Sequence, residues 1–250
     1  MTTESTGGDG HFGEKVASGY DSSSGFEFDP AVITATVDFL ADLTSGGRVL
    51  ELGIGTGRIA LPLAERGVPV HGIDLSRAMV ERLRAKPGGA AIEVSIGDFA
   101  TTRVEGPFSL AYLVFNTIEN LTTQDAQVEC FANAAAHLAP GGHFVVECAI
   151  PDLRALPRGE RAVVFDVSEG HWGIDEYDVA TQGLVSHHFT RVGDGVEYSS
   201  GPFRYVWPSE LDLMAHMAGM RLTERWSGWH REPFTDESRK HISVWEKPRV

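Results

Sequence analysis

The feature that most constrains the fold is the alternation of short apolar runs with helical patterns over the first 150 residues. Five runs are almost entirely apolar, as strands must be when helices cover both faces of a sheet, and they span 49–52, 70–73, 92–96, 110–115 and 144–149. Helical spacing is found between or before these runs at 29–43, 58–66, 76–86 and 123–138. The alternation predicts an α/β fold with a doubly wound parallel sheet.

After residue 150 the pattern changes to polar–apolar alternation, which is typical of antiparallel strands. Three such segments, joined by glycine-containing turns, span 161–167, 184–192 and 196–207. A helix over 209–218 and strands over 220–226 and 241–246 follow. We therefore expect a Rossmann-like seven-stranded sheet that is closed by a C-terminal hairpin, with an inserted antiparallel sheet after the fifth strand.

These patterns divide the 250-residue chain into four parts. Residues 1–13 are small and polar, lack a basic start and an apolar stretch, and predict a disordered tail and not a secretion signal. We expect a cofactor-binding core over 14–160, an insertion over the active site at 161–207, and a C-terminal helix and hairpin at 208–250.

Composition limits the partners that the protein can have. The apolar runs are far shorter than the about 20 residues that a membrane span needs, so we expect a cytoplasmic protein without a membrane partner. A net charge of −14 without a run of Lys or Arg disfavours nucleic acid. Cys130 and Cys148 are too few for a disulfide framework, and no metal site is expected.

The segment 49-VLELGIGTG-57 joins the first predicted strand to a helix. Gly53, Gly55 and Gly57 would let the backbone approach a ligand closely, because glycine has no Cβ and tolerates positive φ. The spacing does not match the dinucleotide fingerprint G-x-G-x-x-G, since residue 58 is Arg. Glu51 would repel a pyrophosphate at this position, and it would attract an ammonium or sulfonium group.

Two more carboxylates end the next two predicted strands. Asp74 follows the second strand, where it can accept hydrogen bonds from both hydroxyls of a ribose, and Asp98 follows the third in 97-GDF-99. The carboxyl ends of parallel strands meet at one edge of a sheet. We therefore expect these side chains and Glu51 to converge on one crevice.

On these motifs the sequence resembles the class I S-adenosylmethionine (SAM)-dependent methyltransferases over about residues 14–247. The motif E/D-x-G-x-G-x-G begins at Glu51, 74-DLSRAM-79 and 97-GDF-99 match the ribose and adenine motifs, and 139-APGG-142 matches the turn before the fifth strand. The resemblance implies SAM as cofactor and S-adenosylhomocysteine as its product. It also implies that the cofactor contacts are Tyr20, Glu51, Gly53, Gly55, Gly57, Asp74, Leu75, Met79, Asp98, Phe99 and Phe115.

The segment 115-FNTIENL-121 occupies the family position that faces the transferred methyl group. It lacks the Asn/Asp-Pro-Pro-Tyr/Phe motif of nucleobase methyltransferases, and with the inserted sheet it resembles enzymes of natural-product metabolism, including those that methylate amino sugars. Many of these carry a His where this sequence has Asn120, which cannot accept a proton at neutral pH. Other candidates for a catalytic role are Glu119, His187, His188 and His230, and alternation allows only one of the adjacent histidines to face the crevice.

Candidates for the acceptor pocket are Asn116, Trp172, Arg204, Tyr205 and Trp229. The expected reaction is methyl transfer to an N or O atom of a small molecule in secondary metabolism, and the resemblance also suggests a homodimer. Three alternatives stay open at this point: a SAM-binding protein with a non-methylating reaction, an NAD-dependent oxidoreductase, and a non-enzymatic interaction module.

Overall fold

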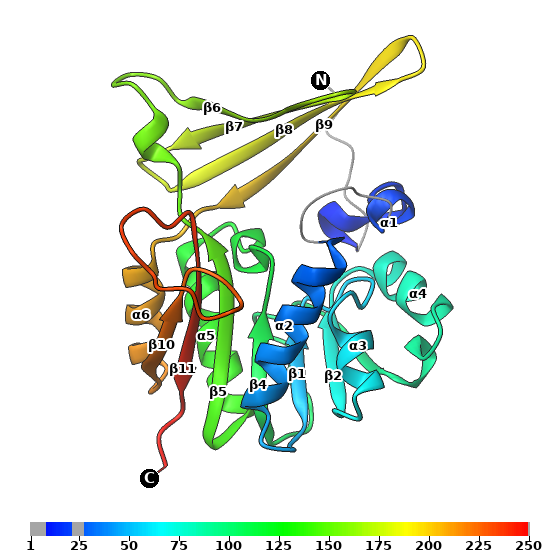
Figure 1. Ribbon diagram of the computed structural model, residues 1–250, viewed down its shortest axis with the longest axis vertical. Helices are drawn as coiled ribbons and strands as arrows, with labels where there is room; N and C mark the ends of the chain where they lie inside the picture. The colour runs from blue at the N-terminus through cyan, green and yellow to red at the C-terminus, as the bar shows by residue number, and fades with distance from the viewer. Residues whose placement is uncertain (1–8, 22–27, 250) are drawn as a thin grey trace.

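The computed structural model describes residues 9–21 and 28–249, and it consists of an α/β core beneath a separate four-stranded sheet (Figure 1). The strands of the central sheet, in spatial order, are β3 (Glu93–Ile96), β2 (Val70–Asp74), β1 (Val49–Leu52), β4 (Phe108–Leu113), β5 (Leu138–Ala149), β11 (Lys240–Glu246) and β10 (Arg221–Trp226). The first five are parallel, and β11 and β10 are antiparallel to their neighbours. The predicted seven-stranded sheet with a C-terminal hairpin is confirmed.

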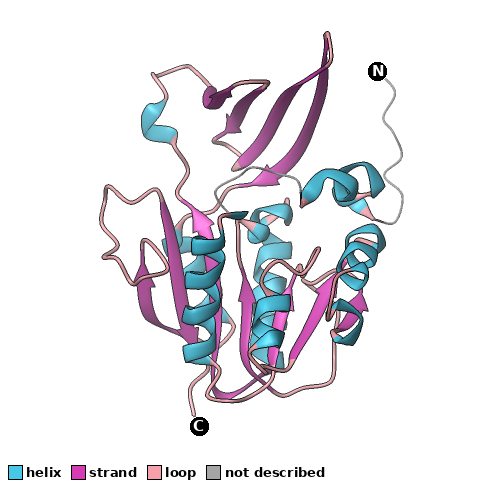
Figure 2. Ribbon diagram, turned by 45° about the vertical axis from the view of Figure 1, so that its right-hand side comes forward, coloured by secondary structure: helices cyan, strands magenta, loops and turns pink. Residues whose placement is uncertain are grey.

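Helices cover both faces of this sheet (Figure 2). They are α1 (Glu14–Tyr20), α2 (Pro30–Leu43), α3 (Ala60–Glu65), α4 (Arg77–Ala85), α5 (Gln124–His137) and α6 (Pro208–Met217), with 3₁₀ turns η1 (Gly10–Phe12), η3 (Gly89–Ala91), η4 (Thr117–Asn120) and η5 (Leu153–Ala155). Local side chains start several of them, because a side-chain oxygen satisfies one of the free N–H groups of the first turn. Ser76 accepts from Met79 N at 3.1 Å, and Thr123 accepts from Ala126 N at 3.2 Å.

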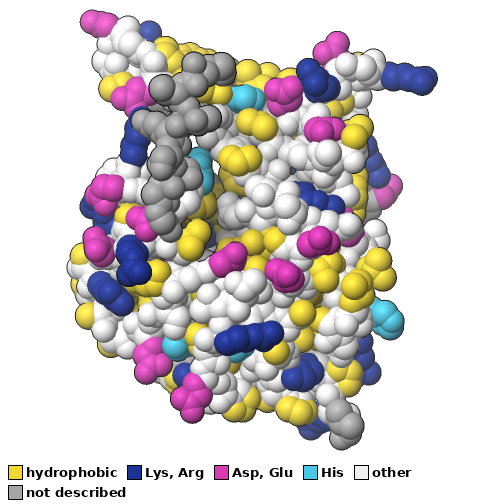
Figure 3. All heavy atoms as spheres, turned by 180° about the vertical axis from the view of Figure 1, so that it is seen from behind, with side chains coloured by type: hydrophobic (Ala, Val, Ile, Leu, Met, Phe, Trp, Pro, Cys, Tyr) yellow, Lys and Arg dark blue, Asp and Glu magenta, His cyan; other side chains and the backbone are white. Residues whose placement is uncertain are grey.

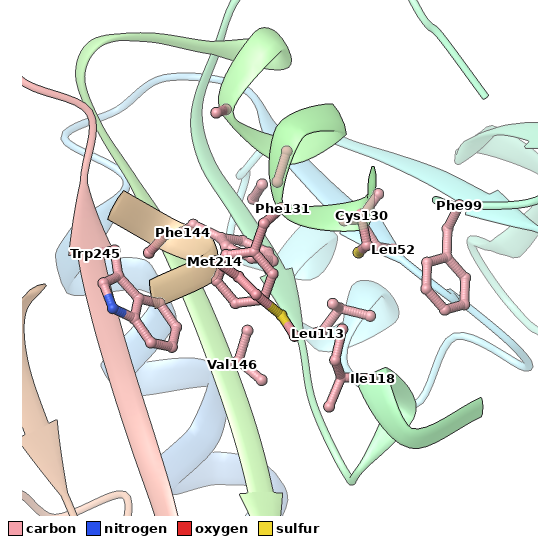
Figure 4. Packing of buried hydrophobic residues seen from close by; sticks show 14 of the residues in the cluster. Leu52, Phe99, Leu113, Ile118, Cys130, Phe131, Phe144, Val146, Met214 and Trp245 are labelled. Atoms are coloured by element: carbon pink, nitrogen blue, oxygen red, sulfur yellow. The ribbon is translucent and has the colours of Figure 1, made fainter. Parts of the chain in front are cut away.

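Alternating residues of the central strands fill two apolar layers. On one face, Phe131 of α5 and Met214 of α6 pack against Phe144, Val146 and Trp245 of the sheet, and all five are buried (Figure 4). The opposite face packs against α2 and α3. Strands covered on both faces explain why the sequence shows continuous apolar runs.

The second sheet consists of β6 (Ala162–Ser168), β7 (His171–Asp178), β8 (Gly183–Val192) and β9 (Gly195–Arg204), paired antiparallel in that order. It lies above the carboxyl ends of the parallel strands (Figure 1). The sequence predicted only three strands here. β7 was missed because Gly173 interrupts it and three of its eight residues are Asp or Glu, which have low strand propensity.

The N-terminal segment differs from the prediction of a disordered tail. Residues 1–8 lie outside the described residues, but residues 9–13 are ordered against α4. Ser76 Oγ donates to Phe12 O at 2.6 Å, and Arg77 N donates to Asp9 Oδ1 at 3.0 Å. These long-range hydrogen bonds order a segment whose local composition is that of a loop.

Among the described residues, no helix is both long and apolar enough to cross a membrane. Cys130 and Cys148 are both buried free thiols. The back of the molecule shows basic side chains interspersed with acidic ones (Figure 3).

Candidate active site

The glycine loop between β1 and α3 takes a conformation that requires glycine. Gly53, Gly55 and Gly57 have φ of 76°, 54° and 79°. A Cβ on Gly53 would lie 2.7 Å from Thr117 Cγ2, and a Cβ on Gly57 would lie 2.2 Å from Leu83 Cδ1. The loop therefore presents bare backbone at the carboxyl end of the sheet.

Glu51 lies beneath this loop and is only 4% exposed. Tyr112 Oη donates to Glu51 Oε2 at 2.7 Å, and Arg58 also favours the charged form, but burial dominates and raises the pKa of Glu51 to about 8. This carboxyl group is therefore mostly protonated at pH 7 even with Arg58 nearby. A bound ammonium or sulfonium group would restore its charge, so the residue fits the methionine part of SAM.

A cavity of about 40 Å³ opens above Glu51. Its lining includes Tyr20, Glu51, Gly53, Arg58, Phe115 and Thr117. The structure thus brings together Tyr20 of the N-terminal helix, the glycine loop and the segment after β4. Arg58 and Thr117 were not among the residues predicted for the site, although Arg58 directly follows the glycine motif.

Asp74, at the end of β2, is fixed by the same loop. Its Oδ2 accepts from Gly55 N at 2.6 Å and its Oδ1 accepts from Ser76 N at 2.8 Å, while burial raises its pKa. Met79 is buried with its Cε 3.4 Å from the Cβ position of Gly55, whereas Leu75 is 44% exposed. A carboxylate held in this way at a strand end suits ribose hydroxyls.

Asp98 and Phe99 follow β3 at the same edge of the sheet. Asp98 is exposed and its Oδ1 accepts from Ala100 N at 2.8 Å, while Phe99 is 9% exposed. The Phe99 ring lies 3.8 Å from the Cβ position of Gly53, so this segment and the glycine loop meet. In the described part of the chain, no group of three or more His, Cys, Asp and Glu is arranged to hold a metal ion.

The segment after β4 is strained. Phe115 and Asn116 have φ of 56° and 55°, a region that a bulky residue rarely adopts. Glu147 Oε2 accepts from Phe115 N at 3.0 Å, and Asn116 Oδ1 accepts from Ala149 N at 2.7 Å. Asn116 was predicted to contact the acceptor, but its side chain holds this backbone against β5.

Glu119 follows in η4 and is 7% exposed. Cys148 Sγ lies 3.6 Å from its Oε1, and burial raises the pKa of Glu119 to about 8. Asp175 of β7 contributes to this shift by charge repulsion. The neighbouring Asn120 donates from Nδ2 to Thr117 O at 3.2 Å.

Asp175 was not singled out in the sequence because β7 was not predicted. Burial raises its pKa, and a hydrogen bond from Ser186 opposes the shift. Its Oδ1 is buried and has no hydrogen-bond partner among the described residues. A buried polar atom of this kind usually meets a ligand or an ordered water.

The structure places His187 and His188 on opposite faces of the insertion, as alternation requires. His187 bonds Tyr198 Oη at 2.9 Å on the outer face. His188 lies on the face that carries Ser186 and Asp175, with its Nε2 3.3 Å from Ser186 Oγ. Of the two, His188 is therefore the one on the side of the crevice.

The other residues predicted for the site either are held in packing contacts and ion pairs or lie on the outer surface. Arg204 is 4% exposed and its guanidinium bonds Glu210 Oε1 at 2.8 Å, and Trp229 is 6% exposed and packs on Phe39 in the core. Trp172 is on the outer face of the insertion, where its register neighbour is Phe189 and not His188. The remaining two are Tyr205, which is 2% exposed and packs against Tyr177, and His230, which is exposed on the loop between β10 and β11.

Comparison with known proteins gives consistent results. A family model described as a methyltransferase domain matches residues 49–142. The chain is 35% identical to the CcbJ methyltransferase of Streptomyces caelestis, with a TM-score of 0.85 and coverage of 95% of this chain and 98% of that chain. Its sequence is 26% identical to the cypemycin N-terminal methyltransferase of a Streptomyces species, over 81% of this chain and 84% of the relative.

The fold is also that of CalS10, described as an amino pentose methyltransferase of Micromonospora echinaspora involved in calicheamicin biosynthesis. The TM-score is 0.66 at 22% identity, with coverage of 92% of this chain and 95% of that chain. That structure was solved with SAM bound.

Proposed function

Because the chain belongs to the class I SAM-dependent methyltransferases, of the natural-product type, we propose that it methylates an amine nitrogen of a small molecule in secondary metabolism. The observation that carries this proposal is the combination of the buried carboxyl group of Glu119 with the half-buried carboxyl group of Asp175, whose Oδ1 atom is buried. Both have raised pKa values, and Asp175 Oδ1 has no partner among the described residues. A cationic amine placed between them would supply the missing partner and favour their charged forms.

The glycine loop, Glu51 and Asp74 would hold SAM, with Asp98 and Phe99 at the adenine. SAM supplies the methyl group as an electrophilic sulfonium. The chain's own residues align the acceptor nitrogen with that methyl group and exclude water. The names of two similar proteins, the cypemycin N-terminal methyltransferase and the amino pentose methyltransferase CalS10, also support a nitrogen acceptor.

An amine that enters as an ammonium ion must lose a proton before its lone pair can attack. Glu119 is the group we assign to this step, because a pKa of about 8 lies near that of the amine and the proton transfer is close to balanced. Asn120 cannot serve as the base, and here it would only orient a polar group. Asp175 stabilises the ammonium ion until its proton has moved to Glu119.

The test is methyl transfer from labelled SAM to matched acceptors that carry an amine or a hydroxyl group at the same position. We expect product only from the amine, with the label on nitrogen by NMR. Glu119→Gln should lower kcat by about 100-fold or more, as expected for loss of a general base, and the exposed Glu129→Gln should leave kcat unchanged. Methylation of oxygen would contradict the proposal. SAM binding without any methylated product would favour a non-methylating reaction instead.

A further inference from the structure

The face of the insertion that looks toward the core carries a chain of four hydrogen-bonded polar side chains, which we call the inner-face chain. It consists of Asp166, His171, His188 and Ser186. His171 Nδ1 lies 2.5 Å from Asp166 Oδ2, and His171 Nε2 lies 3.1 Å from His188 Nδ1. His188 Nε2 lies 3.3 Å from Ser186 Oγ. None of these groups has a role in the reaction proposed above.

One assignment of hydrogen atoms satisfies every contact in the chain. His171 donates from Nδ1 to the Asp166 carboxylate, which leaves its Nε2 to accept from His188 Nδ1–H. His188 Nε2 then accepts from the Ser186 hydroxyl. Burial, followed by the nearby histidines 171, 11 and 187, lowers the pKa of His188, so this ring is neutral at pH 7 and can act as both donor and acceptor. All donors point the same way along the chain.

The chain connects the candidate acceptor pocket with solvent. Ser186 is 8% exposed and pairs with Asp175 across β7 and β8. Its single hydroxyl proton is donated to Asp175 when that carboxyl group is charged. When Asp175 is protonated, its carboxyl group donates to Ser186 Oγ, and the Ser186 proton is donated to His188 Nε2. Asp175 in turn interacts electrostatically with Glu119. At the other end, the Asp166 side chain is 37% exposed.

Two glycines make room for the groups that cover the chain. Gly173 lies opposite His188, and a Cβ there would be 2.2 Å from Phe165 Cζ. Gly201 lies opposite Ser186, and a Cβ there would be 2.9 Å from His11 Cε1. Phe165 and the N-terminal segment therefore lie over the chain in places where a larger residue would keep them away.

We propose that the inner-face chain conducts the proton released by the acceptor amine from the pocket to solvent. This inference rests on the proposed function. Once the amine proton taken up by Glu119 has reached Asp175, Asp175 gives a proton to Ser186 Oγ, and the Ser186 proton moves to His188 Nε2. The Nδ1 proton of His188 moves to His171 Nε2, and the Nδ1 proton of His171 moves to the Asp166 carboxylate, which releases it to water. One proton enters and one leaves, and each link keeps its charge. The passage moves the N–H of each imidazole from Nδ1 to Nε2, so both rings must return to the starting tautomer before the next turnover.

The test interrupts the chain at two points and compares each variant with a change on the outer face. The variants are His188→Gln and Ser186→Ala, and the control is Arg191→Gln, at an exposed residue on the outer face of β8. In dilute buffer we expect kcat to fall about tenfold or more in both chain variants, with KM for the acceptor and the affinity for S-adenosylhomocysteine unchanged. Added small buffers such as imidazole should raise kcat of the variants and not that of the wild type, because they carry the proton instead. The control should match the wild type throughout.

A structural effect would give a different result. Lower kcat without a response to buffer concentration, or wild-type kcat in Ser186→Ala at low buffer, would overturn the relay. If His188→Gln does not fold, Ser186→Ala still decides, since it removes only one hydroxyl group. The wild-type protein separates the two proposals: N-methylated product from the wild type upholds the amine acceptor even when the relay fails.

Discussion

Replacement of Glu51 by Gln tests the electrostatic basis of cofactor binding. Gln keeps the shape of the side chain and an oxygen that accepts from Tyr112 Oη, but it cannot become charged. In the wild type, SAM or S-adenosylhomocysteine must bind the ionised form of a group whose pKa burial raises to about 8. Binding then releases a proton, and the affinity falls as the pH is lowered below 8.

The magnitude follows from this linkage. For a pKa of about 8, the fraction of ionised Glu51 rises about 20-fold between about pH 6.0 and about pH 7.5, so the affinity for S-adenosylhomocysteine should rise by the same factor. Over this range the ligand keeps its ammonium group. Calorimetry in buffers of different ionisation enthalpy measures the released proton directly.

The Gln variant should lose this pH dependence and bind about 10- to 100-fold more weakly at about pH 7.5, the loss expected for a hydrogen bond to a charged group. The exposed Glu65→Gln is the matched control and should retain the wild-type profile. A flat profile in the wild type, or an unchanged slope in the variant, would refute the role given to Glu51.

Two further changes test the framework of the site by urea denaturation. Gly53→Ala should lower the free energy of unfolding by about 1–3 kcal/mol, because it forces a residue with a Cβ to φ 76° and places that Cβ 2.7 Å from Thr117; an unchanged value would contradict the strained loop. Arg204→Met should cost about 2–3 kcal/mol, because it leaves the partly buried Glu210 without its cation. Arg221→Met, in an exposed pair, should cost less than about 1 kcal/mol, and equal losses would argue against this distinction.

The convergence of the residues predicted to hold the cofactor could be expected from the sequence, because they lie in short contiguous segments at strand ends. Glu51 and Asp74 each follow an apolar run, and the parallel arrangement of the strands brings their ends together whatever the rest of the chain does. The glycine loop fixes the backbone locally. The sequence could not indicate that Glu51 is buried deeply enough to be neutral, since this depends on packing by Tyr112 of the neighbouring strand β4.

The acceptor half could not be predicted to the same extent. Successive side chains of a strand point to opposite faces of a sheet, so the sequence separates them into two sets. It does not indicate which of the two sets faces the core. Trp172 was placed in the pocket by the sequence analysis, yet it lies on the outer face, while Asp175 was overlooked on the inner one. Arg204 looked available for a ligand, but its partner Glu210 comes from a helix that packs against the insertion.

The two halves share one physical property. Glu51 and Glu119 are both buried carboxyl groups with a pKa of about 8, and both are therefore mostly neutral in the empty protein at pH 7. Two permanently ionised carboxylates at these positions would cost several kcal/mol each in desolvation. Under the proposed function these neutral groups become charged when a cation arrives, which is a sulfonium or ammonium group of SAM at Glu51 and an amine at Glu119. Each cation therefore favours ionisation of the carboxyl group that binds it, and each binding step must release the proton of that group. This is why an exit route for protons is of use at the acceptor, where the proton must leave in every turnover.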